Sequence, residues 1–175
     1  LTLAMVSFGV SIAAQAIQNA APKCFKAGTL VACLDHAGKE TLKPIEEIEV
    51  GDKVLAYDEE TGEQGYKEVV RLFRNETQEW HHVFVNGEEI VCTAEHPFYV
   101  DGKGFVPARE LKERDNLLLS DGSKVEIESL KTEHVEIPET TYNFEVKDFH
   151  TYYVTETKVL VHNVCETKLY RAMSD

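Results

Sequence analysis

Residues 44–58 read PIEEIEVGDKVLAYD, and residues 107–121 read PARELKERDNLLLSD. At this fixed offset (107 − 44 = 63) a Pro, a Glu, a Leu and two Asp coincide, and apolar positions match apolar positions. Each copy predicts a helical turn after the Pro, followed by an Asp and a strand. We interpret the copies as a duplication, which implies two related β lobes about a pseudo-two-fold axis. Chance similarity between two such units is the alternative.

The segment from Cys24 to Asn163 consists of short alternating apolar runs, a pattern typical of β-strands. Asn-Gly and Asp-Gly pairs between the runs supply the positive φ angles that tight hairpins require. No long stretch has helical periodicity, so we predict an all-β domain with a short helical turn near Pro44 or Pro107. The predicted strands are Lys53–Tyr57, Trp80–Val85, Glu89–Cys92, Asn116–Leu119 and Val125–Ile127.

The composition fits one ordinary domain plus flanking pieces in a chain of 175 residues. Hydrophobic residues make up 43% of the chain and charged residues 28%, as in a typical soluble globular protein. The formal net charge of −13 argues against a general affinity for nucleic acid or anionic lipid. The acidic residues are spread through the middle of the chain, which favours a solvated surface over an acidic tail.

We divide the chain into an upstream flanking segment (1–23), the β domain (24–163) and the start of a downstream module (164–175). Residues 1–22 carry no charged side chain, and we expect them to be the helical tail of a larger upstream protein. A membrane or export segment is the alternative, because residues 14–16 (AQA) resemble a signal-peptidase site. However, the apolar core is shorter than the roughly 20 residues of a membrane span.

The four cysteines are Cys24, Cys33, Cys92 and Cys165, and none forms a Cys-x-x-Cys pair. Their spacing suits neither a zinc finger nor a dense disulfide framework. We expect a free thiol at Cys24 and buried thiols at Cys33 and Cys92. A Cys33–Cys92 disulfide is the alternative, and it would require Cα atoms within about 7 Å of each other.

The first border of the β domain carries groups that can rearrange a peptide bond. The Cys24 thiolate can attack the Lys23 carbonyl and convert the amide into a thioester, although an unperturbed Cys pKa of about 8.5 leaves little thiolate at neutral pH. We expect His96 to donate a proton to the Cys24 nitrogen, while Thr93 holds the carbonyl oxygen. For His96 alone, a hydrogen-bonded turn before Pro97 is the alternative.

The second border ends in His162-Asn163. The Asn163 side-chain amide can close onto its own carbonyl as a succinimide and release whatever follows. Holding the two groups in near-attack geometry supplies the acceleration, since effective molarities reach about 10⁵–10⁸ M. We expect His162 to polarise the carbonyl or protonate the leaving nitrogen, and His150 to activate the Asn163 amide.

Four motifs, in this order, resemble the motif blocks of Hint domains, the fold shared by inteins, hedgehog autoprocessing domains and bacterial intein-like domains. Residues 24–29 (CFKAGT) are similar to the intein opening block and residues 92–98 (CTAEHPF) to the central Thr-x-x-His block. Residues 142–154 (YNFEVKDFHTYYV) and 159–163 (VLVHN) resemble the two closing blocks. The chain is especially similar to the bacterial intein-like and pretoxin Hint domains that precede toxin modules. It is too short to hold a homing endonuclease.

Two departures from the intein pattern change what the resemblance implies. Val164 follows Asn163 where a splicing intein has Cys, Ser or Thr, so the transfer of the upstream segment lacks its acceptor. Cys165 could substitute only through a larger ring. Asn143 stands where many inteins place an Asp that coordinates the two ends, which should weaken the coupling between the two steps. We therefore expect cleavage as the main outcome, with splicing minor or absent.

By resemblance, the domain is a bacterial β horseshoe that processes its own flanking polypeptides without a cofactor and without nucleic acid. We expect a monomer, in a cytoplasmic precursor that belongs to a secreted or cell-surface toxin protein. A metal-binding module using Cys24, Cys92, His96 and His162 is one alternative, with zinc as an inhibitory ligand of Cys24, His96 and His162. A catalytically decayed β interaction module is the other. The segment 169–174 (LYRAMS) faintly resembles the first strand of ADP-ribosyltransferase-like toxins, although a linker is preferred.

Overall fold

The computed structural model describes residues 23–163. The expectations for residues 1–22, a helical tail or an export segment, lie outside the described residues, as do those for the downstream segment 164–175. Within the described part, no helix has the length and apolar character needed to cross a membrane.

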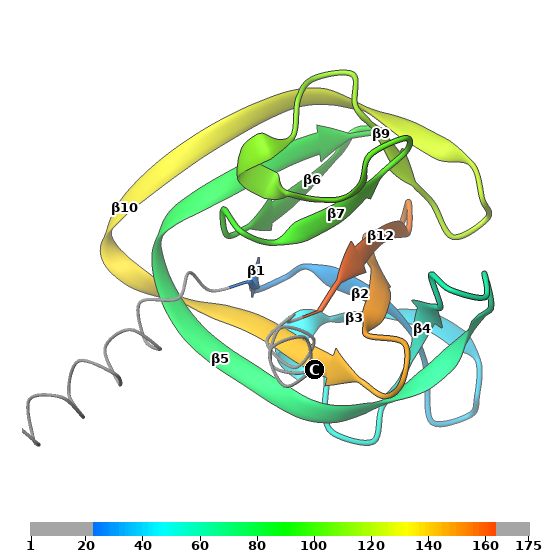
Figure 1. The fold of residues 1–175 in the computed structure, drawn as a ribbon. Helices are drawn as coiled ribbons and strands as arrows, with labels where there is room; N and C mark the ends of the chain where they lie inside the picture. The colour runs from blue at the N-terminus through cyan, green and yellow to red at the C-terminus, as the bar shows by residue number, and fades with distance from the viewer. Residues whose placement is uncertain (1–22, 164–175) are drawn as a thin grey trace, which may run out of the picture.

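The described residues form one extended antiparallel sheet system with two single-turn 3₁₀ helices (Figure 1). This confirms the prediction of an all-β domain, and the predicted strands recur as all or part of β4, β5, β6, β9 and β10. The strands are β1 (Phe25–Lys26), β2 (Leu30–Leu34), β3 (Glu40–Pro44), β4 (Lys53–Tyr57), β5 (Gln64–Val85), β6 (Glu88–Cys92), β7 (Pro97–Val100), β8 (Gly104–Pro107), β9 (Asn116–Leu118), β10 (Lys124–Val146), β11 (Thr151–Val154) and β12 (Val159–His162).

Strands β5 and β10 are two long curved arms that pair with each other and sweep around the molecule (Figure 1). Their pairing shifts register at three places, between Ile127 and Ser129, between His134 and Glu139, and between Glu145 and Val146. Such bulges bend and twist a ribbon, which gives the arms their curvature. Strands β2 to β4 lie at one end of the horseshoe and β6, β7 and β9 at the other.

The duplication predicted from the sequence repeat is present in the backbone. The 3₁₀ helix η1 (Ile45–Glu47) precedes β4, and its counterpart η2 (Ala108–Glu110) precedes β9 at the same offset. The Asp52 carboxylate accepts a hydrogen bond from the Glu49 amide at 2.9 Å, and Asp115 accepts one from the Lys112 amide at 2.9 Å. Each Asp also binds a lysine ammonium, Lys43 or Lys103. The repeated Asp therefore fixes the same turn in both lobes.

Both borders of the domain run into the centre of the horseshoe (Figure 1). Strand β1 is inserted between β6 and β10, where Phe25 faces Cys92 on one side and Tyr142 on the other. Strand β12 lies between β11 and β7, with Val161 opposite Phe98. Side chains from both lobes form the main apolar core around these strands. Two segments far apart in sequence are thus held in one buried region.

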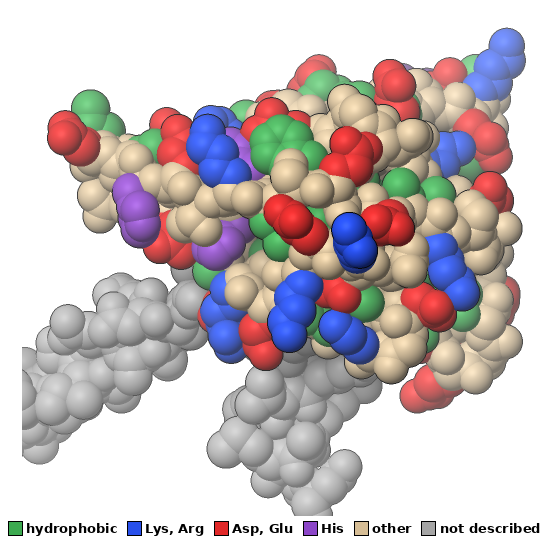
Figure 2. Space-filling model, turned by 90° about the horizontal axis from the view of Figure 1, so that it is seen from above, with side chains coloured by type: hydrophobic (Ala, Val, Ile, Leu, Met, Phe, Trp, Pro, Cys, Tyr) green, Lys and Arg blue, Asp and Glu red, His purple; other side chains and the backbone are tan. Residues whose placement is uncertain are grey.

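The surface carries mixed charge, as Figure 2 shows for one face, where acidic and basic side chains alternate with small apolar patches. Among the described residues, the large exposed hydrophobic side chains are Val50, Val70 and Ile137. The described cysteines, Cys24, Cys33 and Cys92, are all buried and free, so the alternative of a Cys33–Cys92 disulfide is wrong.

Candidate functional site

Both polar atoms of the Lys23–Cys24 peptide bond, the carbonyl oxygen and the amide nitrogen, form hydrogen bonds with side chains of the domain. The Asn143 side-chain amide donates a hydrogen bond to the Lys23 carbonyl oxygen at 2.5 Å. The Cys24 amide donates to the Thr93 hydroxyl at 3.0 Å, and the Thr93 amide donates back to the Cys24 carbonyl at 2.9 Å. We expected Thr93 to hold the carbonyl oxygen, but the structure places Asn143 there and Thr93 on the nitrogen. Asn143 can take the oxygen because an amide carries both a donor and an acceptor.

Two hydrogen bonds to its oxygen fix the orientation of the Asn143 side-chain amide. Its oxygen accepts hydrogen bonds from the Tyr152 hydroxyl at 2.6 Å and from the Phe144 amide at 2.8 Å. With two donors on the oxygen, the NH₂ group has to face the Lys23 carbonyl. Tyr152 is fully buried, and the sequence analysis did not single it out. Its position two residues after His150, on the strand that follows the β10 arm, was the available signal.

Replacing Tyr152 by Phe should slow any reaction at the Lys23 carbonyl by about fivefold. The ring would keep its contact with Phe144, 4.2 Å between centroids, but one of the two bonds that orient Asn143 would be lost. One hydrogen bond contributes about 1 kcal/mol, and 1.4 kcal/mol corresponds to a tenfold change in rate. Thiol-induced cleavage at residue 23 measures this. In the control Tyr153→Phe, which loses a bond to Gln64 instead, the rate should stay within twofold of wild type, and an equal loss in both variants would contradict the role.

Burial raises the pKa of the Cys24 thiol, and this favours its protonated form. Thr141, Asn75 and the positive charge of Arg74 act in the opposite direction and favour the thiolate. The Asn75 amide lies 3.8 Å from the sulfur. Because Thr141 pairs with Asn75 across the two arms, the β5–β10 ribbon itself brings these groups to the thiol. Sequence analysis missed them, since nothing in a polar stretch of strand indicates its partner.

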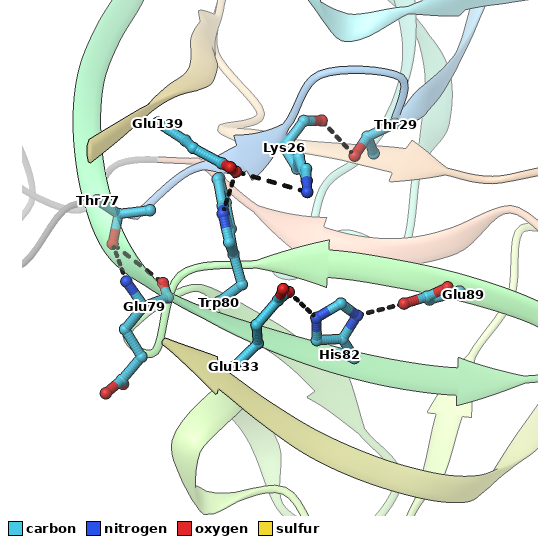
Figure 3. Close-up of polar contacts among 9 residues, drawn as sticks. All are labelled: Lys26, Thr29, Thr77, Glu79, Trp80, His82, Glu89, Glu133 and Glu139. Carbon is cyan, nitrogen blue, oxygen red and sulfur yellow. Dashed lines mark hydrogen bonds and ion pairs between the residues drawn. The ribbon is translucent and has the colours of Figure 1, made fainter. Parts of the chain in front are cut away.

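Strand β1 is held in place by a cluster beside the border (Figure 3). The Glu139 carboxylate accepts a hydrogen bond from the Trp80 indole at 2.7 Å and lies 3.5 Å from the Lys26 ammonium. Nearby, the His82 ring on β5 lies between the carboxylates of Glu89 on β6 and Glu133 on β10. Through Glu139 and Trp80, Lys26 ties β1 to both arms, two residues after Cys24.

His96 is completely buried beside this border, with its ring centroid 4.0 Å from that of Phe25. Burial lowers its pKa to about 3, although an interaction with the Lys23 backbone acts slightly the other way. Neither ring nitrogen reaches hydrogen-bond geometry with another described residue. The imidazole is therefore neutral at physiological pH, and both ring nitrogens are able to donate or accept a proton beside the first border.

The burial of neutral His96 predicts a stability change with pH. Its pKa of about 3 in the folded state lies below the unfolded value of about 6.5, so the unfolded state binds the extra proton in between. Stability is therefore lost as pH falls through 6.5 toward 3, by about 2 kcal/mol at pH 5 for this residue. Urea unfolding of wild type and His96→Gln at pH 7 and pH 5 should show a shallower loss in the variant. Equal losses would contradict the assignment.

Asn163, at the second border, is also completely buried. Its backbone amide donates to the His150 carbonyl at 2.9 Å. In the orientation that satisfies its partners, the side-chain NH₂ donates to the same carbonyl at 2.8 Å and the side-chain oxygen accepts from the Val146 amide at 3.0 Å. We expected the His150 imidazole to activate this amide, but the structure places the main-chain carbonyl against it. A role for the imidazole stays a prediction.

His162 contacts the carbonyl of the bond that follows Asn163. Its Nδ1 lies 2.7 Å from the Asn163 carbonyl oxygen, and because a carbonyl only accepts, Nδ1 carries the proton. Its Nε2 lies 3.6 Å from a carboxylate oxygen of Glu59, a residue that sequence analysis did not select. His162 also influences the pKa of His96, which places the imidazoles of the two borders within electrostatic range of each other.

The alternative of a metal site finds no support in the described part of the chain. Residues 23–163 contain no group of three or more His, Cys, Asp or Glu side chains that could hold a metal ion. This range includes the proposed zinc ligands Cys24, Cys92, His96 and His162. The remaining expected site residues, Val164 and Cys165, lie outside the described residues.

Comparison with known proteins gives a consistent result. The sequence profile of the pretoxin HINT domain matches residues 37–164. A bacterial intein-like domain from Clostridium thermocellum is 44% identical, with a TM-score of 0.74 over 81% of this chain and 99% of that one. The gp41-1 intein is 26% identical, with a TM-score of 0.63 over 80% and 98%. A DnaB intein from Synechocystis sp. PCC 6803, 19% identical with a TM-score of 0.67 over 81% and 98%, shares the fold. No curated protein sequence matches the chain.

A fold of this kind supports autocatalytic protein processing in general. The profile match extends over most of the chain, and the intein-like domain from Clostridium thermocellum is similar along almost its whole length. With a duplicated β horseshoe and both borders buried at its centre, this chain belongs to the pretoxin Hint family of bacterial intein-like domains.

Proposed function

We propose that the protein cleaves its own chain at the Lys23–Cys24 and Asn163–Val164 bonds. One observation supports this best: the carbonyls of both border residues accept a hydrogen bond from a buried side chain of the domain, Asn143 at the first and His162 at the second. Donors preorganised at a carbonyl stabilise the negative charge that develops when it is attacked. Such a donor at each end of one domain fits two cleavage sites.

At the first border, the Cys24 sulfur attacks the Lys23 carbonyl carbon and the bond to the Cys24 nitrogen breaks. The thiol proton ends on that nitrogen, so an amide and a thiol become a thioester and an amine. Asn143 stabilises the oxygen, and Thr93 holds the departing nitrogen. We propose that His96, buried beside this border, assists the proton transfer. Attack by water or an added thiol then releases the upstream segment.

At the second border, the Asn163 side-chain nitrogen attacks its own backbone carbonyl carbon, and the bond to Val164 breaks. One proton leaves the side-chain amide and one is gained by the new amine, so no water is consumed. The product is a succinimide at residue 163 and a free downstream segment. The His150 carbonyl accepts from the attacking NH₂, and His162 donates to the carbonyl oxygen.

Cleavage at both sites, rather than splicing, is the main outcome that we propose. The downstream residue Val164 has no nucleophile to receive the upstream acyl group. The match to a pretoxin domain supports a role in releasing a downstream toxin module from a bacterial precursor. We further propose that the domain acts as a monomer within a cytoplasmic precursor of a secreted or cell-surface protein.

Intact-mass spectrometry of the full chain tests the proposal. Over hours without added thiol, the mass should fall by that of the segment after residue 163. With dithiothreitol, the segment before residue 24 should be lost faster than without it. A mass that stays unchanged under both conditions would overturn the proposal.

A further inference from the structure

We propose that Glu59 holds His162 in the protonated form that donates to the Asn163 carbonyl, and so acts as a positioning residue for the second cleavage. This inference rests on the proposed function. Two contacts carry it, one on each nitrogen of the same imidazole. Nδ1 lies 2.7 Å from the carbonyl oxygen of Asn163, and Nε2 lies 3.6 Å from the Glu59 carboxylate.

The two contacts together specify the charge state of His162. The carbonyl oxygen requires a proton on Nδ1. A neutral ring would then turn the lone pair of Nε2 toward an ionised carboxylate, which is repulsive. A second proton on Nε2 converts that repulsion into an ion pair. His162 is 3% exposed, so little solvent screens the interaction on its side.

The backbone fixes Glu59 near His162 rather than leaving it on a loose loop. Thr151 on β11 pairs in register with His162 on β12. Its hydroxyl accepts a hydrogen bond from the Tyr57 amide at 2.8 Å and donates one to the Tyr57 carbonyl at 2.7 Å. Tyr57 ends β4 two residues before Glu59. Thr151 thus links the strand that carries the histidine to the turn that carries the carboxylate.

The turn itself is closed by its own hydrogen bonds. The Asp58 amide donates to the Glu63 carbonyl at 2.8 Å, and the Gly62 amide donates to the Asp58 carbonyl at 2.8 Å. The Asp58 carboxylate accepts from the Glu60 amide at 2.9 Å. A turn with these bonds presents Glu59 in a defined position, as a positioning residue requires.

His96 and Glu59 both interact with His162, and of these two residues only Glu59 is charged. His96 is kept neutral by burial, with a pKa of about 3, so it carries no charge above that pH. The ring of Phe105 on β8 packs edge-on against His162, with 4.9 Å between centroids, and contributes no charge. Of these three neighbours, Glu59 is therefore the one that stabilises the imidazolium.

The test compares Glu59→Gln with the neighbouring variant Glu60→Gln in the full chain. Glu60→Gln removes the same charge from an exposed residue of the same turn. Release of residues 164–175 is followed by mass spectrometry from pH 5 to pH 8. Glu59→Gln should release the segment about tenfold more slowly at pH 7.5, and the difference from wild type should shrink as the pH falls toward 5, because a lower pH favours the protonated imidazole. Glu60→Gln should follow wild type throughout.

A second comparison separates positioning from a general loss of structure. Dithiothreitol-induced cleavage at residue 23 should be equally fast in wild type and Glu59→Gln, because Cys24 depends on other groups. In a His162→Ala background, Glu59→Gln should have no further effect on release. If wild type releases the segment and Glu59→Gln has the same pH profile, or slows both cleavages alike, the inference is overturned. If wild type releases nothing, the proposed function itself fails.

Discussion

Asn163→Ala should leave the bond after residue 163 intact, with release of residues 164–175 falling by at least about 10⁴-fold. Alanine has no side-chain nitrogen to close the succinimide. The reaction relies on a nucleophile held beside its target, and effective molarities of about 10⁵–10⁸ M are lost with it. Intact-mass spectrometry of the purified chain over hours would measure the release.

The matched control for this prediction is Asn116→Ala, which removes an exposed amide on β9. This variant should release the segment as wild type does. In Asn163→Ala, cleavage at residue 23 with dithiothreitol should continue, because the groups on the Lys23 carbonyl are untouched. Persistent release from Asn163→Ala would show that some other group, or a contaminating protease, breaks the bond.

Cys24→Ala should abolish thiol-dependent loss of the upstream segment. Without the sulfur no thioester forms, and dithiothreitol has nothing to attack except an ordinary amide. The expected reduction in rate is at least about 10³-fold, because the variant loses the nucleophile that is positioned within the chain and only thiol from solution remains. Release of residues 164–175 should proceed in this variant, because Asn163 and His162 keep their contacts.

The control for Cys24→Ala is Cys33→Ala, which removes another buried free thiol from β2. Its cleavage at residue 23 should be retained, with only the stability cost of a small cavity. If both cysteine variants lose thiol-dependent cleavage equally, the effect is one of folding. If neither loses it, the thioester is excluded.

The fold was largely predictable because its determinants are local or repeated. Asn86-Gly87 forms the turn between β5 and β6, and both residues have positive φ, as such a pair favours. The 63-residue offset between residues 44–58 and 107–121 predicts the two lobes from the sequence alone. The length of β5 and β10 was not predictable, because their middle segments are polar and are strands only through pairing with each other.

The residues of the candidate site were likewise only partly predictable from the sequence. Residues inside motifs, such as Cys24 and Asn163, are recognisable from order and spacing along the chain. Glu59, which supports His162 from another strand connection, lies in no motif. Tyr152 lies in a closing motif, but the motif does not indicate that its hydroxyl contacts Asn143. Their roles depend on which strands pair and where a turn closes, and both are tertiary properties. That Asn143 rather than Thr93 contacts the Lys23 oxygen also depends on side-chain direction, which a spacing does not specify.

The most direct test of self-cleavage is the mass of the fragment that ends at residue 163, taken as soon as release is first detected. Cyclisation of Asn163 leaves a succinimide, so the fragment should weigh one water less than the same fragment with a free carboxylate. This form should then convert slowly to the heavier one. A fragment that carries the full carboxylate mass from the first time point would contradict cyclisation, because that is the product of ordinary hydrolysis.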